Sequence, residues 1–181
     1  NWFEKTMSLA PEFWDSYNYH ADYYTHLILR GADGDDTSRE ALDAAMSSLE
    51  DDLSNAMRLA PDAARRNAVA YDLGLLTGRW RGLVSRFDQV VEQGACHMPT
   101  WPEMLTNPFG RAAEVLELAQ RHIDCDPLSF SGWMTSASAS QWLGDFEAAV
   151  ETSRRGFEMT GHRILTNELI ESLVGAGRFE E

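Results

Sequence analysis

The chain has 181 residues, of which 44% are hydrophobic and 24% charged, as expected for a folded domain with its own core. It carries 29 Asp and Glu against 15 Lys and Arg, so the formal net charge is −14 and the surface should repel nucleic-acid phosphates and anionic membranes. The sequence holds no apolar run of about 18 residues, the length that a membrane-spanning helix needs. We therefore expect no nucleic-acid partner and no membrane insertion, and a basic or neutral protein partner is favoured.

The first predicted elements are two helices. Residues 1–10 are typical of the end of a helix whose packing partner is missing, and the chain starts without Met, so we expect a fragment of a longer protein. Residues 14–29 predict a single helix. Trp14, Tyr17 and Tyr24 share one face of it and should pack against the next helix.

A long helix is predicted next, after an acidic turn at residues 33–36. Thr37 and Glu40 have the spacing of a capping box, which predicts a helix start there and an end near Leu59. Apolar residues recur every three or four positions along this segment, as on the buried face of a helix. They are Leu42, Met46, Leu49, Leu53 and Met57.

Glycines at even spacing mark the rest of the chain. Gly78, Gly110, Gly144 and Gly177 are separated by 32, 34 and 33 residues. An aromatic residue follows the glycine by two positions in three of the four cases, at Trp80, Phe146 and Phe179. Since glycine readily takes the left-handed conformation that ends a helix, this period predicts repeated pairs of helices joined by tight turns.

Prolines repeat in phase with these glycines. Pro11, Pro61 and Pro127 each follow a helical pattern, and the last two are 66 residues apart, twice the glycine period. Proline cannot continue a helix and suits the first position of the next one. The combined pattern predicts helix, tight turn, helix and stop in units of about 33 residues, whose apolar faces close only by stacking on neighbouring units.

The residues of these units resemble the tetratricopeptide repeat family. The best match covers residues 130–161, and residues 64–95 are the next best, with Gly78, Trp80 and Phe87. The matching positions of the first are Trp133, Leu143, Gly144, Asp145, Phe146, Ala148, Ala149 and Phe157. A third unit is degenerate, because three prolines in residues 96–109 predict a short or broken helix there.

The resemblance implies an all-α fold, an α–α superhelix in which about four helical hairpins, one of them degenerate, form a solenoid. One domain would span residues 1–181 as a fragment of a longer chain, with a stretched first unit. The predicted units are residues 12–61, 62–95, 96–128 and 129–161, with a partial unit at 162–181.

The sequence contains no motif typical of a catalytic, cofactor-binding or metal-binding site. Cys96 and Cys125 cannot form a four-ligand zinc site alone. We expect two small buried or half-buried thiols in a reducing cytoplasm, since sequence cannot show whether the two sulfurs meet. The five histidines, at positions 20, 26, 97, 122 and 162, are scattered without metal-ligand spacing and predict ordinary surface or half-buried imidazoles. No phosphate-binding loop, dinucleotide fingerprint or nucleophile motif occurs. We expect no metal, no cofactor and no enzymatic activity.

The resemblance also implies where a partner would bind. In tetratricopeptide arrays the first helices of successive repeats line a concave groove. The positions that match here are Asn18, Asp22, His26, Arg65, Asp72, Leu76, Met134, Ser138, Gln141 and Trp142. Asp15 shares this phase, and together with Asp22 and Asp72 it would oppose an anionic ligand, which disfavours an acidic peptide tail.

The function that follows from the resemblance is a protein–protein interaction scaffold that binds a partner segment in its groove. The alanine-rich sequence is similar to the repeat regions of bacterial signalling proteins. This similarity implies a regulatory role within a multidomain protein. Two alternatives stay open. The first is self-association into a homodimer through open repeat ends, and the second is a regulatory domain for a small ligand.

Overall fold

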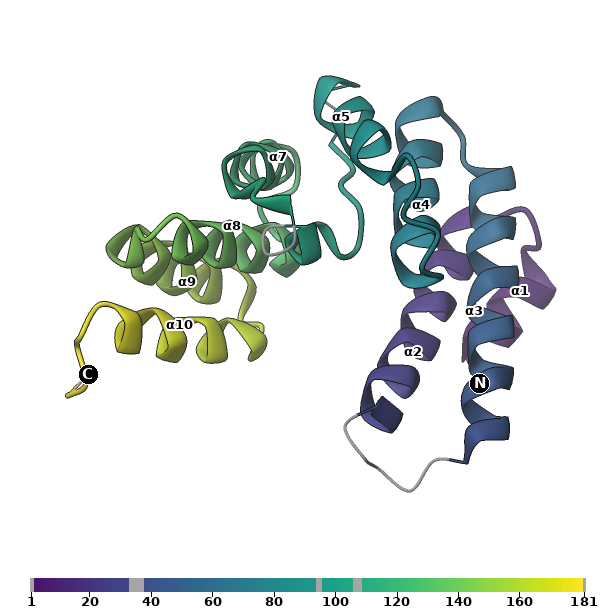
Figure 1. Cartoon of the computed structure of the whole chain (residues 1–181), viewed down its shortest axis with the longest axis horizontal. Coiled ribbons are helices and arrows are strands. Elements are labelled where there is room, and N and C mark those ends of the chain that lie inside the picture. The colour runs from purple at the N-terminus through teal and green to yellow at the C-terminus, as the bar shows by residue number, and fades with distance from the viewer. Residues whose placement is uncertain (1, 33–37, 94–95, 106–108, 181) are drawn as a thin grey trace. The chain divides into compact units, whose positions relative to one another are not determined.

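The computed structural model describes residues 2–32, 38–93, 96–105 and 109–180, and every regular element within these ranges is a helix (Figure 1). The expected all-α class is thereby confirmed, whereas superhelical stacking of the hairpins remains a prediction. Contacts divide the chain into two compact units, Asn1–Gln93 and Gly94–Glu181. None of the described helices is long and apolar enough to cross a membrane.

The described residues of the first unit form five helices. They are α1 (Trp2–Leu9), α2 (Trp14–Ala32), α3 (Arg39–Leu59), α4 (Ala63–Leu76) and α5 (Leu83–Gln93). Helices α2 and α3 lie side by side as a long hairpin, with α1 against α2, and α4 packs against both α3 and α5 (Figure 1).

The core of this unit joins three helices. Ala21 of α2, Leu49, Leu53 and Ala56 of α3, and Val69 of α4 form one buried cluster. The predicted aromatic face of α2 and apolar stripe of α3 are confirmed, because residues of both pack against this cluster. These half-buried side chains are Trp14, Tyr17, Tyr24, Met46 and Met57. Burial of such apolar faces, each incomplete on its own helix, holds the three helices together.

The start of α3 differs from the predicted capping box by one residue. Ser38 is the N-cap, and its hydroxyl accepts a hydrogen bond from the backbone N–H of Ala41 at 3.2 Å. Thr37 lies outside the described residues, as does the acidic turn at residues 33–36. The predicted end at Leu59 is confirmed.

The described residues of the second unit include one short 3₁₀ helix and four α-helices with defined bounds. They are η1 (Pro102–Leu105), α7 (Ala112–Cys125), α8 (Phe130–Trp142), α9 (Phe146–Thr160) and α10 (Ile164–Gly175). Helix α8 packs between α7 and α9, and α10 contacts both α8 and α9. Ile123, Trp133 and Leu165, from three different helices, form a buried cluster.

The turn glycines adopt the predicted conformation. Gly78, Gly110, Gly144 and Gly177 have φ values of +70°, +62°, +79° and +73°. Each is in the left-handed region that side chains with a Cβ resist. Gly78 and Gly144 lie between the two helices of a pair, whereas Gly110 precedes α7 and Gly177 follows the end of α10. The described part of residues 96–109 agrees with the expected short or broken helix, since η1 is a single turn there. Phe109 is also helical, and residues 106–108 lie outside the described part.

Candidate functional site

The predicted binding face begins with polar residues of α2. Asn18 is buried, and its Oδ1 has no hydrogen-bond partner among the described residues. Asp22 is half-buried, with its Oδ2 3.6 Å from the Nε2 of His26, which lies one turn later and is largely exposed. Burial raises the pKa of Asp22, and the neighbouring His26 charge opposes that rise. The face therefore holds polar groups that have lost part of their water.

Asp15 and Arg65 link α2 electrostatically to α4. Burial raises the pKa of the half-buried Asp15 carboxyl, and the positive charge of Arg65 lowers it in part. The guanidinium of Arg65 is ion-paired with Asp62 and lies 6.0 Å from the ring centroid of Trp14. Asp62 also caps α4 by accepting a hydrogen bond from the backbone N–H of Arg65 at 2.8 Å. These contacts fix Arg65 beside the polar face of α2.

Two other predicted residues of α4 lie inside the first unit. Asp72 is only 2% exposed, and Leu76 packs against the core cluster of α2, α3 and α4. Their side chains contribute to packing in the structure as it stands. The structure thus places Asp15, Asn18, Asp22 and His26 on α2 and Arg65 on α4, whereas Asp72 is buried and Leu76 is half-buried against the core.

The four predicted residues of the second unit lie along α8. Met134 packs against the cluster of Ile123, Trp133 and Leu165, and Ser138 is half-buried. The Nε2 of Gln141 donates a hydrogen bond to the Oγ of Ser172 on α10 at 2.9 Å. Trp142, at the end of α8, is 54% exposed.

Glu168 of α10 is a neighbour of Gln141 that the sequence analysis missed. One carboxyl oxygen of Glu168 lies 3.5 Å from the Nε2 of Gln141. Burial, and to a smaller extent the charge of Glu171, raises the pKa of Glu168 to about 7. This carboxyl can therefore gain or lose a proton near neutral pH. No sequence signal marks it, because its burial depends on how α10 meets α8.

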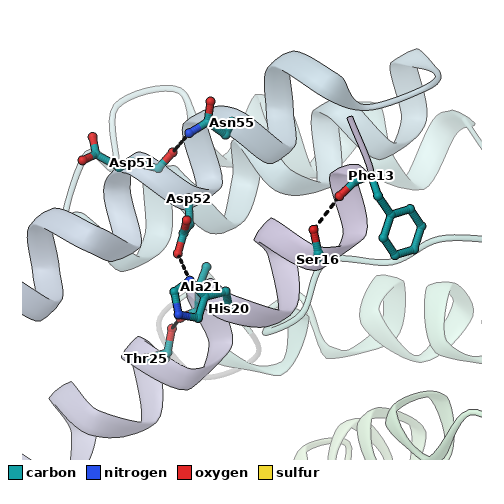
Figure 2. Close-up of polar contacts among 8 residues, drawn as sticks. All are labelled: Phe13, Ser16, His20, Ala21, Thr25, Asp51, Asp52 and Asn55. Atoms are coloured by element: carbon teal, nitrogen blue, oxygen red, sulfur yellow. Dashed lines mark hydrogen bonds and ion pairs between the residues drawn. The ribbon is translucent and has the colours of Figure 1, made fainter. Parts of the chain in front are cut away.

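A buried ion pair joins α2 to α3 (Figure 2). The Nδ1 of His20 lies 2.8 Å from the Oδ2 of Asp52, and His20 is 5% exposed. Burial raises the pKa of Asp52, and the charge and hydrogen bonding of His20 oppose this. The expectation of an ordinary surface or half-buried imidazole is thus wrong for His20, because two long helices close over it.

Aromatic rings surround this pair. The His20 ring centroid lies 4.8 Å from that of Tyr24 and 5.9 Å from that of Phe3 on α1. Since rings and helices enclose the imidazole, the pair is placed to hold α1, α2 and α3 together rather than to meet a substrate. Across the described part of the chain, no group of three or more His, Cys, Asp or Glu is placed to hold a metal ion.

The cysteines form a disulfide in the second unit. Cys96 and Cys125 are bonded with their Cα atoms 5.5 Å apart, and both residues are exposed. The prediction of two small buried or half-buried thiols is therefore wrong, because the segment before η1 returns to the end of α7 and the two sulfurs are bonded. His122 holds the same segment, with its Nδ1 2.6 Å from the Cys96 carbonyl oxygen and its Nε2 3.0 Å from the Oγ of Ser129.

Comparison with known proteins does not extend this description. No protein-family model matches the chain, and no curated protein matches it significantly. The likeness to tetratricopeptide repeats stays a resemblance of spacing and residue type.

Proposed function

We propose that this chain is a helical scaffold that binds a segment of a partner protein through the polar face of α2 beside α4. This face is defined by Asp15, Asn18, Asp22 and His26 of α2 and Arg65 of α4. The proposal is supported by the all-helical fold, by the hairpin repeats and by the arrangement of these side chains.

One observation carries the proposal: Asp15 and Asp22, on one side of α2, are both half-buried carboxyls whose pKa is raised by burial. Buried polar groups that lack full compensation cost stability. Hydrogen-bond donors or positive charges from a bound segment would offset that cost. Asn18 lies on the same side of α2, but its Oδ1 is buried and so is enclosed by the fold rather than open to a bound segment.

The same groups define the chemistry of the partner. Carboxylates accept hydrogen bonds, so the two carboxyls favour Lys and Arg side chains and backbone N–H groups. The formal net charge of −14 adds a long-range attraction for a basic segment. An acidic peptide would meet repulsion at both carboxyls. The partner segment is therefore basic.

Selection from a display library of random peptides tests the proposal directly. The intact chain should select sequences enriched in Lys or Arg, and Asp22→Lys should abolish that selection. Asp43→Lys is the matched control, since it makes the same charge change on α3, where the Asp43 side chain is 70% exposed. Equal loss in both variants, or no enrichment by the unaltered chain, would contradict the proposal.

A second candidate function, self-association, has its own observation. Ile170 and Val174 are 55% and 54% exposed and lie four residues apart on α10, so they share one face of that helix. A second copy that covered this face would bury both side chains. Light scattering at micromolar concentration distinguishes the two functions, because a stable monomer excludes this dimer and leaves the scaffold intact.

Cytoplasmic placement and a regulatory role within a multidomain protein also remain proposals. The Cys96–Cys125 disulfide bears on the first of these. Disulfides persist in oxidising compartments and are rare in the reducing cytoplasm. The bond therefore argues for an oxidising location, and the redox state of the two cysteines in cells would decide between the alternatives.

A further inference from the structure

The turn between α7 and α8 brings a histidine onto a serine. His122 lies in the last turn of α7, and Ser129 is the N-cap residue of α8. Asp126 reverses the chain between them, since its backbone N–H donates to the His122 carbonyl at 2.8 Å and its carbonyl accepts from the Ser129 N–H at 3.1 Å. As a result, the Nε2 of His122 lies 3.0 Å from the Oγ of Ser129. Both residues are half-buried, so they are held by the fold but still accessible.

The hydrogen bonds of His122 determine which ring nitrogen carries the proton. Its Nδ1 lies 2.6 Å from the backbone oxygen of Cys96, and a carbonyl oxygen can only accept, so Nδ1 is the protonated nitrogen of the neutral ring. Nε2 is then an acceptor, and the hydroxyl of Ser129 donates to it. The hydroxyl of Ser131, 2.9 Å away, donates in turn to the Ser129 oxygen, whose own hydrogen is already used. The hydrogen bonds therefore run in the direction that an activated serine requires.

Two features hold the imidazole in this position. The disulfide bonds Cys96 to Cys125, the last residue of α7, so the carbonyl that orients the His122 ring is tied to the helix that carries the ring. Gly132 of α8 leaves room for the ring, because a Cβ there would lie 3.0 Å from the Cδ2 of His122. The base and the group that orients it are thus in place before a substrate arrives, which favours catalysis.

The start of α8 can stabilise negative charge beside this hydroxyl. In the described structure the Ser129 side chain makes no capping hydrogen bond to α8, because its hydroxyl turns to His122 instead. The backbone N–H groups in the first turn of a helix have no acceptor within the helix, and the helix dipole is positive at that end. An oxyanion that forms on a group attached to the Ser129 Oγ would lie at this end of α8.

We propose that Ser129 and His122 form a nucleophile and general base that hydrolyse small carboxylic esters. The Oγ of Ser129 bonds to the ester carbonyl carbon while its proton passes to the Nε2 of His122. That proton goes to the alkoxide as the ester C–O bond breaks, which releases the alcohol and leaves the acyl group on Ser129. Water then attacks the acyl group and gives a proton to Nε2, and this proton returns to Oγ as the carboxylic acid leaves.

A fluorophosphonate probe tests the pair on the full chain. Such a probe labels a serine whose proton is removed by a base, as the Oγ–P bond forms and fluoride leaves. We expect peptide mapping to place the label on Ser129, and the labelling rate should fall about a hundredfold in His122→Asn through loss of the general base. Turnover of p-nitrophenyl acetate should be lost in Ser129→Ala. It should be unchanged in the matched control Ser85→Ala, since Ser85 is exposed on α5 of the first unit.

His122→Gln keeps the test valid if His122→Asn fails to fold. Its side-chain amide can still form a hydrogen bond with Ser129 but cannot take up the serine proton, so labelling should be lost while the thermal midpoint is kept. The proposal is overturned if Ser129 stays unlabelled or reacts no faster than Ser85. It is also overturned if a folded His122 variant labels at the unaltered rate, or if Ser129→Ala retains full turnover. None of these outcomes bears on the polar face of α2, which belongs to the first unit.

Discussion

The imidazole of His20 and the carboxyl of Asp52 are 32 residues apart in sequence, yet the Nδ1 of one lies 2.8 Å from the Oδ2 of the other. Figure 2 shows the pair spanning the contact between α2 and α3. Because the residues are 5% and 9% exposed, neither side chain can exchange this partner for bulk water.

Removal of one member of this pair should therefore destabilise the first unit. We expect Asp52→Ala to cost about 2 kcal/mol, since it leaves a buried imidazole without its acceptor. The neighbouring exposed residue supplies the control, and Asp51→Ala should change stability by less than about 0.5 kcal/mol. Urea denaturation of both variants measures the difference. A double-mutant cycle with His20→Ala that showed no coupling would contradict the interpretation.

Glu168 should make stability depend on pH near neutrality. Its pKa rises from the ordinary 4.5 to about 7 in the folded chain, so the folded state binds a proton more tightly than the unfolded state does. Stability from this group is present below about pH 4.5 and is lost as pH rises toward 7. Relative to the unaltered chain, Glu168→Gln should gain stability over that range and keep the gain above pH 7. Unfolding free energies of both proteins from pH 4.5 to 8 test this, and parallel profiles would show that Glu168 is not the group responsible.

The disulfide should stabilise the second unit alone. Cys96 and Cys125 are 29 residues apart. Closing a loop of that length restricts the unfolded chain and so stabilises the folded state by about 3.6 kcal/mol. Reduction should lower the thermal midpoint of the second unit and leave that of the first unchanged. The double variant Cys96→Ser with Cys125→Ser should have the thermal midpoint of the reduced chain, and adding reductant should not change that midpoint. Hydrogen exchange resolved by segment assigns the change to one unit or the other.

Gly175 is predicted to tolerate no side chain. A Cβ there would overlap the Phe146 ring, so Gly175→Ala should destabilise the contact between α9 and α10 by about 2 kcal/mol. Combining it with Phe146→Ala should recover part of the loss, because the smaller residue leaves room. Val174→Ala, at an exposed neighbouring position, is the control. If Gly175→Ala proved as stable as the unaltered chain, the close contact between Gly175 and the Phe146 ring would not limit the packing of α10 on α9.

Local features of the fold were predictable from sequence. The period of Gly78, Gly144 and Gly177 marked the turns because each glycine acts on its own backbone, and all three have positive φ. The stripe on α3 was visible because side chains three or four residues apart share a helical face. The cap was misplaced from Ser38 to Thr37, since either hydroxyl can begin a helix and their difference lies in backbone geometry.

The candidate site was less predictable. The position of each residue within the repeat selected Asn18, Asp22 and His26. It did not predict that Asn18 is buried while His26 is exposed. Repeat position also selected Asp72, which the structure places in the interior at 2% exposure. The position of a residue within a repeat predicts which side of its helix the side chain occupies. Whether that side chain is buried depends on which neighbouring helix packs against that side.

The sequence by itself determined where helices begin and turn, since those choices rest on glycine, proline and side-chain spacing within a few residues. Only the tertiary structure decided that His20 meets Asp52, that Cys96 meets Cys125 and that Glu168 loses its water. Each of these contacts requires segments that are distant in sequence to meet in the folded chain. The protonation or bonding of such a group depends on the atoms that surround it in space, which the sequence does not give.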